Sequence, residues 1–197
     1  MSYLQRTQRR ELILTAATQL AFDEGLSAVT SRRIAQVAEM STGQVHHHFE
    51  SISHLKAEVF LALMQQLDAL EHAAAPADPT TALLIALGAL NIQHSQVYLA
   101  LWNEAEVLME QDPVLKVAYI QTMQAWQRNV VSIIDTGVAS QHFKLANDQH
   151  SDAVAWRLIA FICGLEGMYQ LQLFPNSIDD FKQQTLIMIQ RELGTAQ

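Results

Sequence analysis

The apolar residues of this chain recur at helical spacing, and that periodicity restricts the fold more than any other feature of the sequence. From Leu12 to Ala21 they follow one another at intervals of one, three and four, which predicts a first helix that ends near Gly25. Only seven glycines and four prolines interrupt the 197 residues, and no alternating run typical of a strand is present. The sequence therefore predicts an all-α protein.

Capping residues divide the chain into about nine helices. Thr30 can cap a second helix, and Ser41 can cap a short third helix that runs to about His48. Asp78 and Asp112 each precede a proline, an arrangement typical of a helix start. The later helices are predicted from Ser51 or Ser53 to His72, from Pro79 to about Leu90, over Gln93–Gln111, from Pro113 to about Ala139, from Asn147 or Asp148 to about Leu173, and from Ser177 onward. We expect an N-terminal three-helix domain, residues 1–52, and a larger helical domain, residues 53–197.

The segment Thr30–Phe49 has the spacing of a helix-turn-helix motif, with two short capped helices and a tight turn at Glu39-Met40. Apolar residues such as Ile34 and Val45 would hold the two helices together. Side chains suited to DNA remain outside, because Arg and Gln can form paired hydrogen bonds with base edges and Thr can pack on a thymine methyl. These outward residues are Arg32, Arg33, Thr42, Gln44, His46 and His47.

The charge distribution fits an N-terminal part that binds a polyanion. The chain carries a net charge of −8, but residues 1–56 hold six basic and five acidic side chains, which gives this part +1. Ordinary surface charge explains these numbers equally well. The longest apolar run, Ala82–Leu90, is about half as long as a membrane span, and no signal core follows the first arginines. We therefore expect a cytoplasmic protein with no membrane partner.

Residues 12–56 resemble the DNA-binding domain of the TetR family of transcriptional repressors. The resemblance rests on Ile13, Ala16-Ala17, Phe22, Gly25, Val29-Thr30, Ile34-Ala35, Ala38, Ser41-Thr42-Gly43, Val45, His48-Phe49 and Leu55. It implies a homodimeric, ligand-responsive regulator whose third helix enters the major groove of a palindromic double-stranded operator. A small-molecule effector bound to the C-terminal domain would then release the DNA.

The resemblance also assigns roles to individual positions. Bases or adjacent phosphates would be contacted by Arg32, Thr42, Gly43, Gln44 and His47, and backbone phosphate by Thr30 and Ser31. Three positions depart from the family pattern. His46 replaces a phosphate-binding Tyr, Ile52 replaces a Lys, and Glu39 replaces a turn Gly, where a left-handed backbone would cost about 1 kcal/mol.

Large apolar side chains in the middle of the chain form a candidate effector pocket. Trp, Tyr and Met at these positions fit an apolar cavity with a few polar anchors, although a plain helical core explains each residue taken alone. A carboxylate beside Trp102 that faced this cavity would favour a cationic ligand, although a solvated helix face explains the carboxylates there better. The candidate pocket residues are Met64, Tyr98, Trp102, Glu106, Tyr119, Met123 and Trp126. The stretch Tyr98–Leu115 is loosely similar to the BetI-like, choline/betaine-regulator branch of the family.

Small residues at spacings of three and four in the eighth predicted helix favour close approach of a second helix. Together with the ninth helix they predict a two-fold interface, and the resemblance places the dimer face here as well. Cys163 would be a small hydrophobe buried there. The candidate interface residues are Trp156, Ile159, Ala160, Cys163, Gly167 and Ile187.

No cofactor and no metal site is expected. Consecutive helical residues point about 100° apart, so His46, His47 and His48 cannot converge on one ion. A helical-bundle enzyme is the first alternative function, but Glu104 and Glu106 point to different sides of a helix. A dimeric adaptor that does not bind DNA is the second alternative.

Overall fold

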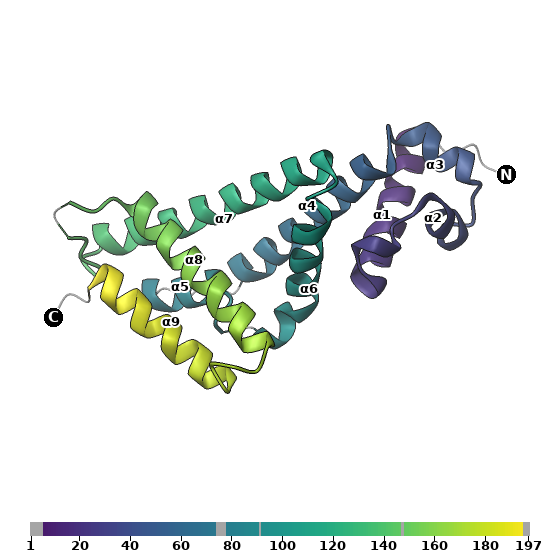
Figure 1. Ribbon diagram of the computed structural model, residues 1–197. Coiled ribbons are helices and arrows are strands. Elements are labelled where there is room, and N and C mark those ends of the chain that lie inside the picture. Colours follow the sequence, from purple (N-terminus) through teal and green to yellow (C-terminus); the bar gives the residue numbers. More distant parts are fainter. Residues whose placement is uncertain (1–5, 74–77, 91, 147, 195–197) are drawn as a thin grey trace. The chain divides into compact units, whose positions relative to one another are not determined.

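The computed structural model describes residues 6–73, 78–90, 92–146 and 148–194. These residues form nine α-helices and one 3-10 helix, and they contain no strand (Figure 1). The helices are α1 (Arg6–Glu24), η1 (Leu26–Ala28), α2 (Ser31–Val37), α3 (Thr42–His48), α4 (Ile52–Ala73), α5 (Pro79–Ala86), α6 (Ile92–Leu108), α7 (Pro113–Ala139), α8 (Ser151–Gln170) and α9 (Ile178–Leu193). The predicted all-α class is confirmed.

Local capping chemistry explains where most helices begin. The Thr30 hydroxyl accepts the Arg33 backbone N–H at 3.3 Å and starts α2. The Asp112 carboxylate accepts the Leu115 N–H at 3.1 Å and starts α7. The same arrangement is present at Ser41, Asp78 and Ser177. The predicted capping residues of these helices are therefore confirmed.

The predicted end of one helix is wrong because the chain turns into a left-handed conformation earlier than expected. Helix α5 ends at Ala86 instead of near Leu90, since Gly88 adopts φ 70° and the Ala89 N–H donates to the Leu84 carbonyl at 2.8 Å. Helix α6 runs over Ile92–Leu108, so it begins one residue earlier and ends three residues earlier than the predicted Gln93–Gln111.

Helix α8 is also shorter than predicted at both ends. It begins at Ser151 with His150 as the N-cap, three residues after Asp148, while Asn147 lies outside the described residues. At the other end, Gln172 adopts φ 56° and the Leu173 N–H donates to the Met168 carbonyl at 3.1 Å. A glutamine in this conformation gives no sequence signal for a helix end.

The chain divides into two compact units. The first consists of the described parts of Met1–Ala69 and Ser95–Thr122, and the second of the described parts of Leu70–His94 and Met123–Gln197. Each unit has its own buried apolar core. The predicted domain boundary between residues 52 and 53 coincides with the start of α4, and the two-domain division at that point stays a prediction.

Side chains on α1 show how the core of the first unit is built. Ile13, Ala17, Leu20 and Ala21 are buried, as the helical spacing predicts. Leu12 is 50% exposed, so its predicted place on the buried stripe is wrong; it lies next to the stripe on the helix surface. Among the described helices, none is long and apolar enough to span a membrane.

Candidate functional site

Helices α1, α2 and α3 form a helix-turn-helix unit with a shared core. Ile34 and Ala35 of α2 and Val45 of α3 are buried together with Phe49, the residue that caps the C-terminal end of α3. Since Val45 anchors α3 by one face, the opposite face of this helix is left outside. The predicted helix-turn-helix geometry is confirmed.

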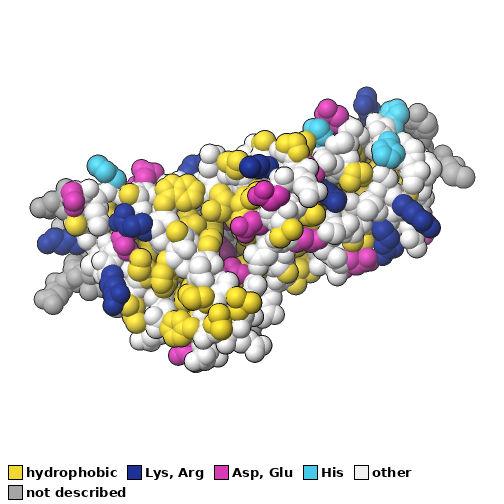
Figure 2. Space-filling view, viewed as in Figure 1, with side chains coloured by type: hydrophobic (Ala, Val, Ile, Leu, Met, Phe, Trp, Pro, Cys, Tyr) yellow, Lys and Arg dark blue, Asp and Glu magenta, His cyan; other side chains and the backbone are white. Residues whose placement is uncertain are grey.

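The predicted DNA-contacting side chains lie on the outer side of this unit. Most are exposed and two are half-buried, and Figure 2 shows His, Lys and Arg side chains gathered near the N-terminal end of the chain. The exposed residues are Thr30, Arg32, Thr42, Gly43, His46 and His47, and the half-buried residues are Ser31 and Gln44. Their contacts with DNA stay predictions.

Gln44 has a structural task besides any contact with DNA. Its side-chain Oε1 accepts the Ser41 backbone N–H at 3.1 Å, while the Gln44 N–H donates to the Ser41 hydroxyl at 3.4 Å. This reciprocal capping box fixes the start of α3. The capping box uses one lone pair of Oε1, so Nε2 and the second lone pair of Oε1 can still pair with a base edge.

The turn between α2 and α3 contains a left-handed residue. Glu39 adopts φ 49°, and the Met40 N–H donates to the Ala35 carbonyl at 2.9 Å. The sequence-based expectation that Glu39 occupies a position suited to glycine is confirmed. The strain is on the order of 1 kcal/mol, and the next residue, half-buried Met40, packs on the core.

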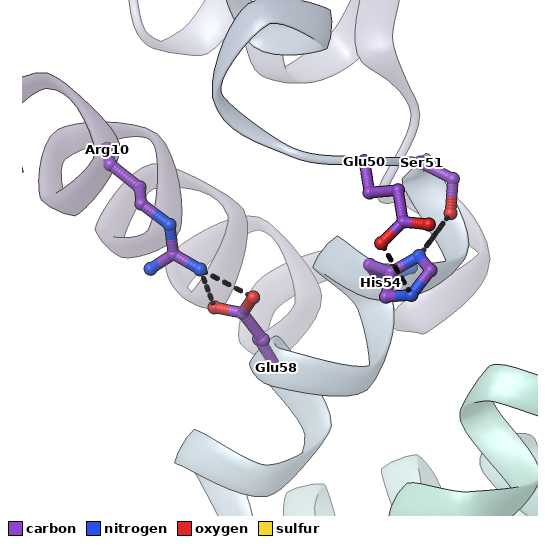
Figure 3. Close-up of polar contacts among 5 residues, drawn as sticks. All are labelled: Arg10, Glu50, Ser51, His54 and Glu58. Atoms are coloured by element: carbon purple, nitrogen blue, oxygen red, sulfur yellow. Dashed lines mark hydrogen bonds and ion pairs between the residues drawn. The ribbon is translucent and has the colours of Figure 1, made fainter. Parts of the chain in front are cut away.

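Two groups of polar contacts hold α1 and α4 of this unit in place (Figure 3). The Arg10 guanidinium donates to both oxygens of Glu58 at 2.5 and 2.6 Å, and it also lies 4.6 Å from the centre of the Phe49 ring. At the start of α4, the Ser51 hydroxyl contacts His54 Nδ1 at 2.8 Å, and Glu50 lies 3.3 Å from His54 Nε2. Arg10 therefore links α1 to Glu58 of α4 and to Phe49, and His54 takes part in the contacts at the start of α4.

His48 is the last residue of α3. Its Nδ1 atom is buried and has no hydrogen-bond partner among the described residues. Burial lowers the pKa of His48 below 6.5, and the positive charges of His47, Arg6, Arg9 and Arg10 lower it further. The predicted partly buried position beside Phe49 is confirmed.

This lowered pKa predicts that acid weakens the folded state. Well above pH 6.5 His48 is neutral whether the chain is folded or unfolded, and as the pH falls through 6.5 the unfolded chain takes up the proton first. We expect the melting temperature to fall more between pH 7.5 and 5.5 for the unchanged protein than for His48→Gln. His150→Gln, at an exposed position, is the control and should keep the full pH dependence. If the melting temperature depends equally on pH in all three proteins, His48 is not the source of the acid sensitivity.

Several predicted pocket residues form an aromatic cluster within the first unit. The Trp102 ring centre lies 4.9 Å from that of Tyr119 and 5.9 Å from that of Phe60, and Phe60 and Tyr119 are stacked. Tyr98 is buried and meets Phe22 edge-on at 5.7 Å. This placement fits a core and a pocket wall alike, so the role of these residues in effector binding stays a prediction.

The other predicted pocket residues are placed as follows. Met64 is buried in the first unit, while Glu106 is exposed on α6. Met123 and Trp126 are half-buried in the second unit, where Trp126 Nε1 donates to the Ala86 carbonyl at 2.6 Å.

Most predicted dimer residues are exposed on α8. Trp156 is 42% exposed, and Ala160, Cys163 and Gly167 follow it at helical spacing on the same face. Figure 2 shows hydrophobic side chains at the surface over this region. Cys163 is therefore exposed within the single chain, so the burial predicted for it would require a partner. The remaining two residues differ: Ile159 is buried in the core of its own unit, and Ile187 of α9 is half-buried.

The sequence offers Glu104 only as a candidate catalytic carboxylate and gives no sign of its structural contact. Glu104 of α6 accepts the backbone N–H groups of Leu26 and Ser27, at 2.6 and 2.7 Å. The partners lie 78 and 77 residues apart in sequence, so no local spacing could indicate this contact. Within the described residues, no group of three or more His, Cys, Asp or Glu side chains could hold a metal ion.

The packed helix-turn-helix unit with an exposed third helix defines a DNA-binding regulator, and comparisons with known proteins give its family. Residues 13–62 match the family described as bacterial regulatory proteins, tetR family. Over 145 residues, 70% of this chain and 68% of the relative, the sequence is 32% identical to the HTH-type transcriptional repressor KstR2 of Mycolicibacterium smegmatis. The chain belongs to the TetR family and is a ligand-responsive, DNA-binding transcriptional repressor, not an enzyme.

Solved structures of the family share the fold. A TetR-family transcriptional regulator from Cytophaga hutchinsonii aligns over 100% of both chains with a TM-score of 0.78 and 14% sequence identity. A transcriptional regulator from Saccharomonospora viridis, solved in complex with choline, aligns over 97% of this chain and 100% of its own with a TM-score of 0.70 and 23% identity. The similarity to the BetI-like branch stays a prediction.

Proposed function

We propose that two copies of this chain bind a palindromic operator, with α3 of each copy in a major groove. The observation that supports this most directly is the division of α3 into two faces. Val45 is buried in the core, whereas Thr42, Gly43, His46 and His47 are exposed. A short helix held by one face and bare on the other has the form of a recognition helix.

Positive charges near α3 would add contacts to phosphate. Arg32 is exposed on α2, while Arg33 pairs with Glu24 and with Gln36. Arg6 and Arg9 lie close enough to the end of α3 to lower the pKa of His48. These few cations support the expectation of a shallower salt dependence than a richly basic DNA-binding protein shows.

The test is binding to the DNA immediately upstream of the gene for this protein. We expect Arg32→Ala and His47→Ala each to weaken binding by about 5- to 150-fold, the cost of losing one well-placed base contact. Where the lost contact is to phosphate, the slope of log affinity against log salt should fall by about 1. Titration of a fluorescent operator fragment at several salt concentrations measures both quantities.

Arg128→Ala is the matched control, since Arg128 is an exposed arginine of α7 in the second unit. It should leave affinity and salt slope unchanged. If Arg32→Ala and Arg128→Ala change the affinity and the salt slope equally, α2 has no specific role in DNA binding. If no sequence-selective binding occurs at moderate salt, the dimeric adaptor that does not bind DNA becomes the better explanation.

The effector is proposed to be a small apolar molecule that contacts the aromatic cluster Phe60, Trp102 and Tyr119. Glu104 is committed to backbone N–H groups and Glu106 is exposed, so neither carboxylate supports a cationic effector. Such a ligand would bind best to a subunit arrangement that no longer matches the operator and would release the DNA by population shift. DNA as the target also supports the proposed cytoplasmic location.

A further inference from the structure

Glu104 joins α6 to the junction between α1 and α2 through a two-pronged contact. Its two oxygens accept separate N–H groups, Oε2 that of Leu26 and Oε1 that of Ser27, at 2.6 and 2.7 Å. Hydrogen bonds to a charged acceptor are about twice as strong as neutral ones. All three residues belong to the first compact unit.

Gly25 makes this approach possible. Its φ is 90°, a left-handed value that favours glycine, and a Cβ atom placed on it would lie 2.7 Å from Glu104 Oε2. The junction is therefore shaped to receive a carboxylate. From Ser27 only two residues lead to Thr30, the cap that starts α2.

The same helix carries two side chains of the candidate effector region. Trp102, two residues before Glu104, contacts Tyr119 and Phe60, and Tyr98 contacts Phe22 of α1. A helix moves as a rigid element, so a displacement of the Trp102 segment is transmitted to the Glu104 carboxylate. The carboxylate in turn sets the position of the chain that leads into α2.

We propose that Glu104 is a positioning residue that couples the aromatic cluster around Trp102 to the helix-turn-helix unit. This inference rests on the proposed DNA-binding function. Coupling between two sites is reciprocal, so operator DNA must alter the surroundings of Trp102 just as a ligand at the cluster alters DNA binding. The reciprocity permits a test that requires no known effector.

The experiment uses the full chain with Trp126→Phe and Trp156→Phe, which leaves Trp102 as the only tryptophan. Titration with operator DNA is expected to change the Trp102 fluorescence. Adding Glu104→Gln should reduce that change by at least about half, because an amide oxygen replaces only one of the two acceptors. Hydrogen exchange at the Leu26 and Ser27 amides should become at least about tenfold faster.

Glu106→Gln is the matched control, because it removes an exposed carboxylate two residues away on α6. It should leave both the fluorescence change and the exchange rates as they are. A parent protein that binds operator without any change at Trp102 overturns the coupling but not the DNA-binding function. An unaltered response in Glu104→Gln at unchanged melting temperature overturns the role of Glu104, whereas failure of the unsubstituted protein to bind operator overturns the proposed function and, with it, the coupling.

Discussion

Replacing Gly167 by Arg is expected to convert the protein into a folded monomer that has lost most of its operator affinity. Gly167 is exposed on α8, and a Cβ atom built on it meets nothing within 4 Å in the single chain. Arginine also favours the helix by about 1 kcal/mol over glycine. The folding stability of one chain should therefore be unchanged or slightly raised.

The loss of operator affinity follows from the loss of the dimer. In a two-fold dimer Gly167 would lie near a helix of the partner, and a long charged side chain there prevents close helix packing. A monomer holds only one half-site, and loss of the linked second contact weakens binding by about 10²- to 10⁴-fold. Sedimentation measures the mass of the particle, and operator titration measures the affinity.

Gln124→Arg serves as the control, since it adds the same charge at an exposed position on α7 of the same unit. It should remain dimeric and bind operator normally. A Gly167→Arg protein that sediments as a dimer and binds like the unchanged protein would place the interface elsewhere. The exposed hydrophobic side chains of Trp156 and Met168 would then need another explanation.

The features that could be predicted from the sequence are those set by neighbours within a few residues. Thr30 and Ser41 cap helices through N–H groups three positions away, so their roles are visible in the sequence itself. The left-handed turn at Glu39 could be predicted from the family pattern at that position. These local signals were sufficient to place α2 and α3, and with them the helix proposed to enter the major groove.

The contacts that could not be predicted join distant parts of the chain. Arg10 and Glu58 lie 48 residues apart, and Glu104 lies 78 residues from Leu26, so no spacing rule relates them. Helix periodicity also leaves the edges of a buried stripe uncertain by one residue, which is why Leu12, predicted to lie on the buried stripe, is exposed. For the same reason Ile159, predicted at the dimer face, lies in the core of its own unit.

Replacing Phe60 by Ala is expected to lower the free energy of unfolding of the first unit by about 3–5 kcal/mol, the usual cost of truncating a buried aromatic side chain. Phe60 is fully buried on α4, and its ring contacts Trp102 of α6 and Tyr119 of α7. Its removal leaves a cavity where the three helices meet. Urea unfolding followed by the fluorescence of Trp102, as the only tryptophan, measures the change.

Two further variants separate the loss of packing from a general effect of substitution. Phe60→Leu keeps most of the apolar volume and should cost less than about 1.5 kcal/mol. Val107→Ala alters a side chain of α6 that is 74% exposed, and it should change the stability by less than about 0.5 kcal/mol. If Phe60→Ala proves as mild as Val107→Ala, the aromatic cluster does not hold α4, α6 and α7 together. Suppose that Phe60→Ala costs most, Phe60→Leu less and Val107→Ala least. The residues proposed to receive the effector are then also those that stabilise the unit to which α3 belongs. A ligand that separates their rings would therefore act directly on the stability of that unit.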